Sequence, residues 1–98
     1  MSTHVVNEFH ALPGRADDVM NLLVDLSPIS RTRPGCQGIS LRRDQDDPMN
    51  IVGDTRWATR RDYDNYLAWR TDSGYTAQFE EMLAQPMWIR YFDEVRAW

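Results

Sequence analysis

Lysine is absent from the chain, and all 11 basic residues are arginine. Without lysine the protein cannot form a Schiff base with a carbonyl substrate or hold pyridoxal phosphate, so these enzyme classes are excluded. Cys36 is the only cysteine, which excludes an intrachain disulfide and every cysteine-rich metal site. The sequence also lacks a dinucleotide-binding glycine fingerprint and a phosphate loop, and we expect no metal and no cofactor.

A surplus of basic charge is missing as well, because the 11 arginines are scattered among 15 acidic residues and the net charge is −4. Phosphate backbones require a clustered basic surface, so we expect no nucleic-acid partner. No apolar run approaches the ~20 residues that cross a bilayer, and we expect no membrane association. The first residues show no signal-peptide pattern, which predicts a cytoplasmic protein.

With 98 residues the chain is long enough for one domain, spanning residues 1–98. Small domains leave much apolar surface exposed unless a partner covers it, which predicts an oligomer.

Alternating and helical periods give the order of elements. We expect strands at 3–10, 37–43, 50–58 and 88–98. A first helix begins at residue 16 and ends near Ser27 and Pro28. A second helix covers 59–70, with Thr59 and Asp62 as a capping pair, and a short helix ends before Pro86. The acidic loop at 44–48 lacks the glycine and distal glutamate of a calcium loop, and a solvated hairpin turn is favoured.

The order β-α-β-β-α-β predicts an α+β, ferredoxin-like fold with one antiparallel sheet and its helices on one face. By parity, the other sheet face mixes apolar residues such as Val6, Val52 and Phe92 with charges of both signs. Such a face suits a second copy of the sheet with matched ion pairs, and we expect a face-to-face homodimer.

Four aromatic residues mark the centre of the chain. Trp57 ends the third strand, and Tyr63, Tyr66 and Trp69 follow in the next helix. Large aromatic residues are usually packing, but tryptophan and tyrosine bring polar tips, so a cluster of them also makes an apolar pocket with directed donors. Asn7 is a second candidate, because it lies between Val5 and Phe9 on a face that should be buried; the alternative is a structural asparagine satisfied by the backbone.

Several motifs together resemble the antibiotic biosynthesis monooxygenase family of dimeric α/β barrels. They are Val6-Asn7-Glu8-Phe9 in the first strand, Pro-Gly before the first helix, Pro34-Gly35-Cys36 before the second strand, and Trp57 ahead of the aromatic helix. The resemblance implies a cofactor-independent monooxygenase that oxidises a phenolic, anthrone-like or quinol-like polyketide with O₂.

On this resemblance the catalytic candidates are Asn7, Trp57 and Tyr63, whose polar groups could stabilise a substrate oxyanion. The candidates for binding a small aromatic substrate are Phe9, Tyr66, Trp69 and Phe79. The family's anthrone oxygenases often carry a second asparagine four residues before the tryptophan, where this chain has Gly53.

The departure at Gly53 leaves a second class open: a cyclase, an isomerase or a barrel that binds a small aromatic ligand without using oxygen. A third is haem degradation, which the family achieves with an asparagine, a tryptophan and an iron-ligating histidine. His4 and His10 are the only histidines and lie on the strand face opposite Asn7, about 20 Å apart, so they cannot share a metal within one chain.

Overall fold

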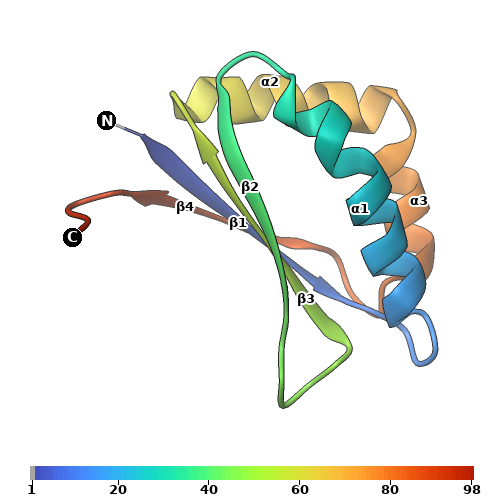
Figure 1. Ribbon diagram of the computed structural model, residues 1–98. Coiled ribbons are helices and arrows are strands. Elements are labelled where there is room, and N and C mark those ends of the chain that lie inside the picture. Colours follow the sequence, from blue (N-terminus) through green and yellow to red (C-terminus); the bar gives the residue numbers. More distant parts are fainter. Residues whose placement is uncertain (1) are drawn as a thin grey trace.

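The computed structural model of the protein describes residues 2–98 (Figure 1). Seven elements follow one another along the chain: β1 (Thr3–His10), α1 (Ala16–Arg31), β2 (Cys36–Arg43), β3 (Asn50–Trp57), α2 (Arg60–Asp72), α3 (Tyr75–Met82) and β4 (Trp88–Asp93). The strands form one antiparallel sheet in the order β2-β3-β1-β4. All three helices lie on one side of it (Figure 1). The predicted α+β, ferredoxin-like fold is confirmed.

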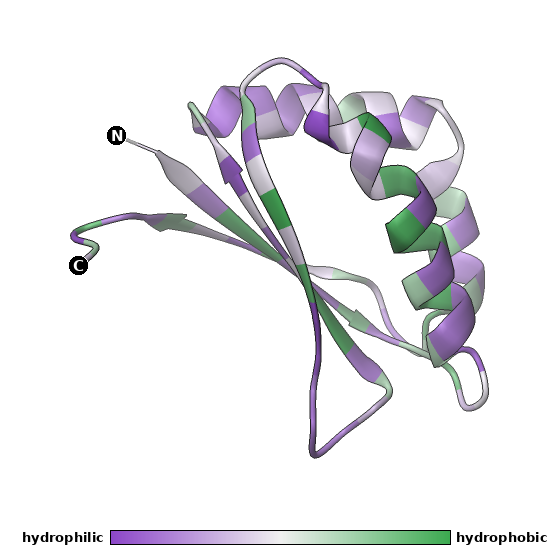
Figure 2. Ribbon diagram, in the orientation of Figure 1, coloured by the Kyte–Doolittle hydropathy of each residue, from purple (hydrophilic) through white to green (hydrophobic). Residues whose placement is uncertain are grey.

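The core lies between the sheet and the helices, where the two-residue alternation of the strands places their apolar side chains. In β1, Val5 and Phe9 are fully buried and Asn7 is 3% exposed. In β3, Ile51 and Trp57 are fully buried on the same face. The apolar face of α1 turns toward the sheet and its polar face turns away (Figure 2). Strand parity read from the sequence therefore identified the buried face.

Local signals explain how α2 and the hairpin begin and end. The Thr59 hydroxyl accepts a hydrogen bond from the Asp62 backbone N–H at 3.2 Å and donates to the Asp62 carboxylate at 3.0 Å, which confirms the predicted capping pair. In the β2-β3 loop, the Asp44 carboxylate accepts from the backbone N–H groups of Asp46 and Asp47 at 2.8 and 3.2 Å. This is the expected solvated turn.

Helix α1 continues one turn past the predicted end at Pro28 and finishes at Arg31, so that prediction was wrong. Proline removes one N–H, but the Ser27 hydroxyl donates to the Leu23 carbonyl at 2.7 Å within the same turn. Ser30, which is 2% exposed, is hydrogen-bonded to the Tyr66 hydroxyl at 2.7 Å. This tertiary bond holds the final turn against the local effect of proline.

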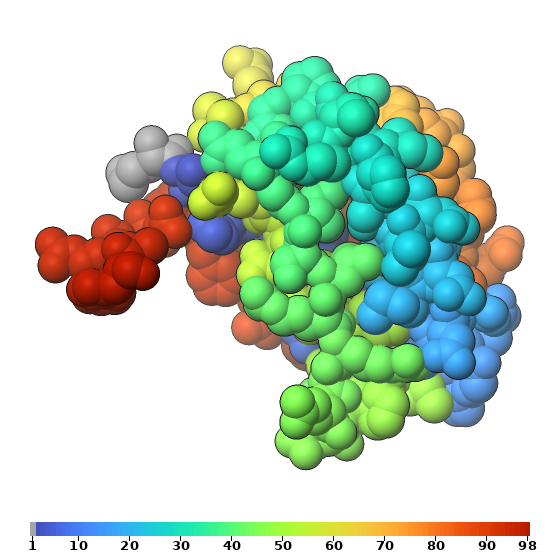
Figure 3. Space-filling model, in the orientation of Figure 1, coloured from blue at the N-terminus to red at the C-terminus, as the bar shows by residue number. Residues whose placement is uncertain are grey.

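Strand β4 is shorter than predicted and ends at Asp93 instead of residue 98. Its partner β1 begins at Thr3, which pairs with Asp93, so no further β1 residue within the strand is left to extend the ladder. The chain after Asp93 extends away from the body of the molecule (Figure 3). Residues 94–98 therefore continue the alternation in the sequence but do not form a strand.

Replacing Ser30 with alanine should destabilise the protein, because the buried Tyr66 hydroxyl loses its partner. A buried polar group left unsatisfied costs about 1–3 kcal/mol, and denaturant unfolding measures that loss. Ser27→Ala is the matched control, since Ser27 bonds only within its own helix. Equal stability losses in the two variants would mean that the Ser30 to Tyr66 bond does not hold the last turn.

Candidate active site

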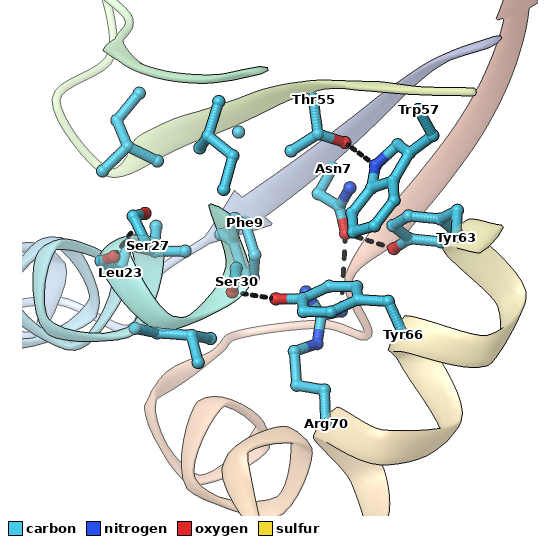
Figure 4. Close-up of a pocket in the computed structure, with 14 residues that line it drawn as sticks. Asn7, Phe9, Leu23, Ser27, Ser30, Thr55, Trp57, Tyr63, Tyr66 and Arg70 are labelled. Carbon is cyan, nitrogen blue, oxygen red and sulfur yellow. Dashed lines mark hydrogen bonds between the residues drawn. The ribbon is translucent and has the colours of Figure 1, made fainter. Parts of the chain in front are cut away.

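A cavity lies between the sheet and the first two helices (Figure 4). The cavity has a volume of about 30 Å³, so an organic ligand enters only if side chains at its edge move. Strands and helices contribute together to its wall, which is lined by Asn7, Phe9, Leu23, Leu26, Ser27, Ser30, Ile39, Leu41, Gly53, Thr55, Trp57, Tyr63, Tyr66 and Arg70. The wall is mostly apolar and aromatic; Asn7, Tyr63 and Arg70 form one polar group, and Ser27 and Ser30 lie on the α1 side.

Asn7, Tyr63 and Arg70 converge at one end of the cavity (Figure 4). The Tyr63 hydroxyl donates to Asn7 Oδ1 at 2.8 Å, and Arg70 Nη2 approaches the same oxygen at 3.4 Å. A guanidinium can only donate, which fixes the orientation of the Asn7 amide with its oxygen toward Arg70. The Asn7 amide nitrogen has no hydrogen bond to residues 2–98, so its N–H groups are available to a ligand.

Burial raises the pKa of Tyr63 to about 12. The positive charge of Arg70 acts in the opposite direction but does not outweigh the loss of hydration. Tyr63 is therefore a neutral phenol at physiological pH, and its proton lies on the bond to Asn7. In this state it is a hydrogen-bond donor and not a base.

Trp57 forms part of the wall, and its indole N–H donates to the Thr55 hydroxyl at 2.8 Å. Thr55 donates in turn to the Val5 carbonyl at 3.0 Å. The ring packs against Tyr63 and Tyr66 at centroid distances of 5.7 and 5.0 Å. The donor that the sequence suggested for a substrate oxyanion is thus already engaged, and the ring shapes the pocket.

The structure brings five of the seven sequence candidates together at the cavity: Asn7, Phe9, Trp57, Tyr63 and Tyr66. The other two lie behind the wall. Trp69 packs between Tyr66 and Tyr75 at centroid distances of 5.9 and 5.8 Å, and Phe79 packs on Phe9 at 5.0 Å.

Sequence reasoning missed Arg70, which is 3% exposed and lines the cavity. It follows Tyr63 by seven residues and Tyr66 by four, so helical spacing places all three on one face of α2. That spacing was the available signal. Arginine is almost never fully buried, so residue type alone does not predict the burial of this side chain.

Gly53 faces Asn7 across the β1-β3 ladder. A Cβ atom at this position would lie 3.9 Å from side-chain atoms of Leu41 and Phe9 and 4.0 Å from the Asn7 Cβ, which is ordinary contact. The backbone therefore does not require glycine here. Because glycine has no side chain, this part of the cavity wall carries no second polar group opposite Asn7.

Neither histidine lines the cavity. His4 and His10 lie on the open face of the sheet, where His4 is 3.8 Å from an Asp54 oxygen and 3.5 Å from a Glu94 oxygen. Within residues 2–98, no three histidine, cysteine, aspartate or glutamate side chains gather as a metal site.

The sequence profile of one family, described as antibiotic biosynthesis monooxygenase, matches residues 2–71. The chain belongs to this family. The match covers most of the chain and includes Asn7, Gly53, Trp57, Tyr63 and Arg70. Among curated proteins, none has a sequence that matches.

Solved structures share the fold of this family member at low sequence identity. Rv0793 from Mycobacterium tuberculosis superposes with a TM-score of 0.87 at 21% identity, over 99% of this chain and 98% of that one. A crystal structure described as an antibiotic biosynthesis monooxygenase superposes with a TM-score of 0.84 at 23% identity, over 96% of this chain and 99% of that one. SnoaB, a cofactor-independent oxygenase from Streptomyces nogalater, superposes with a TM-score of 0.83 at 14% identity, over 98% of this chain and 95% of that one. Of the helices in residues 2–98, none combines the length and apolarity that crossing a bilayer demands.

The raised pKa of Tyr63 predicts a loss of stability in alkali. Its ordinary value of 10 applies to the unfolded chain, so the stabilisation is complete below pH 10 and is lost as the pH rises toward 12. A shift of two units corresponds to about 2.7 kcal/mol. Denaturant unfolding at a series of pH values should show this decrease in the wild type and a smaller one in Tyr63→Phe.

Tyr75→Phe serves as the control, because Tyr75 lies outside the cavity. It should leave the alkaline decrease at the wild-type size. A Tyr63→Phe variant with the full wild-type decrease would show that another group is responsible.

Proposed function

We propose that the protein is a cofactor-independent monooxygenase that oxidises a phenolic or anthrone-like aromatic substrate with O₂. The observation that carries the proposal is the buried polar group of Asn7, Tyr63 and Arg70 at one end of a mostly apolar and aromatic cavity. Membership of the antibiotic biosynthesis monooxygenase family supports the reaction class.

The chemistry needs little from the protein, because the substrate supplies the electrons. A deprotonated phenol or anthrone gives one electron to O₂, the substrate radical and superoxide combine, and the peroxide breaks down to a carbonyl and water. One oxygen atom enters the substrate and the other leaves as water. The pocket has to hold the oxyanion and keep bulk water away.

The proposed roles follow the geometry of the cavity. The unpaired N–H of Asn7 holds the substrate oxygen, and Tyr63 fixes the Asn7 amide while providing a proton donor beside it. Trp57, Phe9 and Tyr66 form the aromatic walls around the substrate ring. Trp69 and Phe79 support these walls from behind.

Asn7→Ala should lower turnover by ~10²–10³-fold, as loss of one oxyanion donor does in other enzymes. Oxygen uptake is the measurement, made after air is admitted to anaerobic mixtures of the protein with a panel of anthrones and quinols. Glu8→Ala, one residue along β1 on the opposite sheet face, is the control and should retain wild-type uptake. No uptake above background with any substrate would refute the proposal.

A second candidate function is a non-oxidative cyclase or isomerase, and the bare wall at Gly53 favours it. The same panel distinguishes the two. Product formed at an unchanged rate under strict anaerobiosis would support the non-oxidative reaction and exclude the oxygenase.

We also propose that two copies pair through the open sheet face. That face carries Phe92 on β4, which is 48% exposed, and the Arg42 to Asp54 ion pair of 3.1 Å on β2 and β3. Helices cover only the other face (Figure 1). An apolar side chain among charges of both signs suits a self-complementary interface.

The dimer proposal predicts a mass in sedimentation equilibrium of twice 11.5 kDa. Phe92→Glu should shift the mass to that of one chain, because it buries a charge in the interface. Val24→Glu, at a similarly exposed site on α1 away from this face, should remain dimeric. A wild-type protein of single-chain mass would refute the proposal.

A further inference from the structure

Arg70 is a buried cation without a counter-charge. Its side chain is 3% exposed, and within residues 2–98 no carboxylate lies within 4 Å of it. Its polar contacts are two neutral acceptors at 3.4 Å, Asn7 Oδ1 and the Met87 sulfur, and its Nε is buried with no partner. A guanidinium carries five donors and stays protonated, so most of its hydrogen-bonding capacity is unused.

The surroundings of Arg70 do not supply the missing charge. Its guanidinium lies 5.4 Å from the ring centre of Tyr66 and 5.9 Å from that of Phe79, contacts that leave a full positive charge. Glu80 and Arg70 both line a separate cavity beyond Phe79, but Glu80 is exposed and makes no ion pair with Arg70. Buried charges in stable proteins are normally paired, and this one is not.

The residues that line the active-site cavity also provide no negative charge to balance Arg70. Of these 14 lining residues Arg70 alone carries a charge, and the set contains no aspartate, glutamate or histidine. A bound ligand therefore provides the only negative charge that can compensate Arg70 inside the cavity. The rings of Phe9, Trp57 and Tyr66 favour an aromatic ligand.

We propose that Arg70 is the specificity-determining residue of this cavity and that it selects aromatic substrates bound as phenolates. The inference rests on the proposed oxygenase function and deepens it by naming the side chain that selects the ionised substrate. The phenol O–H bond breaks and its proton passes to water, because no side chain of the lining is a base at physiological pH. The guanidinium and the Asn7 N–H then hold the oxyanion. The neutral Tyr63 hydroxyl, bonded to Asn7, does not take up the proton.

The test uses 4-nitrophenol, a single-ring phenol whose anion has its own absorption band, and it needs no turnover. Titration of the probe with and without the wild-type protein gives its pKa in the free and bound states. Binding should lower the probe pKa by at least about one unit, which corresponds to about tenfold tighter binding of the phenolate than of the phenol. An unchanged pKa would overturn the proposal.

Arg70→Gln should abolish the pKa shift of the bound probe, and Arg70→Lys should keep part of it because it keeps the charge. Arg61→Gln is the matched control: it removes the same charge from an exposed site on the same helix and should bind like the wild type. A folded Arg70→Gln protein that still shifts the probe pKa would overturn the proposal.

Two further ligands keep the test decisive if Arg70→Gln does not fold. The wild type should bind 4-nitroanisole, which cannot ionise, at least about tenfold more weakly than 4-nitrophenolate, and equal binding would refute the inference. Tight binding of 4-nitrobenzoate without a shift for 4-nitrophenol would assign the site to aromatic carboxylates instead. A shifted probe in a protein that consumes no oxygen would uphold the anion site and refute only the oxygenase.

Discussion

The hydrogen bond from Tyr63 to Asn7 ties β1, one of the two central strands of the sheet, to helix α2 inside the core. An unpartnered asparagine at 3% exposure would cost about as much as a lost buried hydrogen bond, so β1 and α2 are held at the separation that this bond requires. The same bond occupies the amide oxygen and leaves the amide nitrogen unused. One interaction thus fixes the packing of two elements and creates the donor of the site.

Much of this arrangement follows from periodicity in the sequence. The two-residue period of β1 and β3 put Asn7 and Trp57 on the buried face, and the helical period of α2 put Tyr63 and Tyr66 on the side that meets them. Because the order of elements allows few topologies, the single antiparallel sheet with its helices on one face followed as well. These features depend on local patterns and on general rules of strand connection.

What the sequence did not reveal depends on contacts between distant residues. The last turn of α1 survives Pro28 because Ser30 meets Tyr66, which is 36 residues away. The indole N–H of Trp57 has a partner because Thr55 lies beside it on the same face of β3, a pairing of side chains that strand parity allows but does not require. The burial of Arg70 reflects the approach of Asn7 and Met87, 63 and 17 residues away, whereas helical spacing shows only that it shares a face of α2 with the two tyrosines.

Two residues at the cavity are poorly explained by folding alone. Gly53 has an ordinary backbone conformation and room for a Cβ, although glycine in a strand weakens it. Arg70 buries a charge that the protein does not neutralise. Both lie next to Asn7, one across the β1-β3 ladder and the other against its amide oxygen. Departures from the rules of stable packing concentrate where a protein binds its ligand, since a bound ligand fills the bare wall and supplies the missing charge. On the proposed function, the cost of the two residues falls on the empty protein and is recovered when the aromatic anion binds.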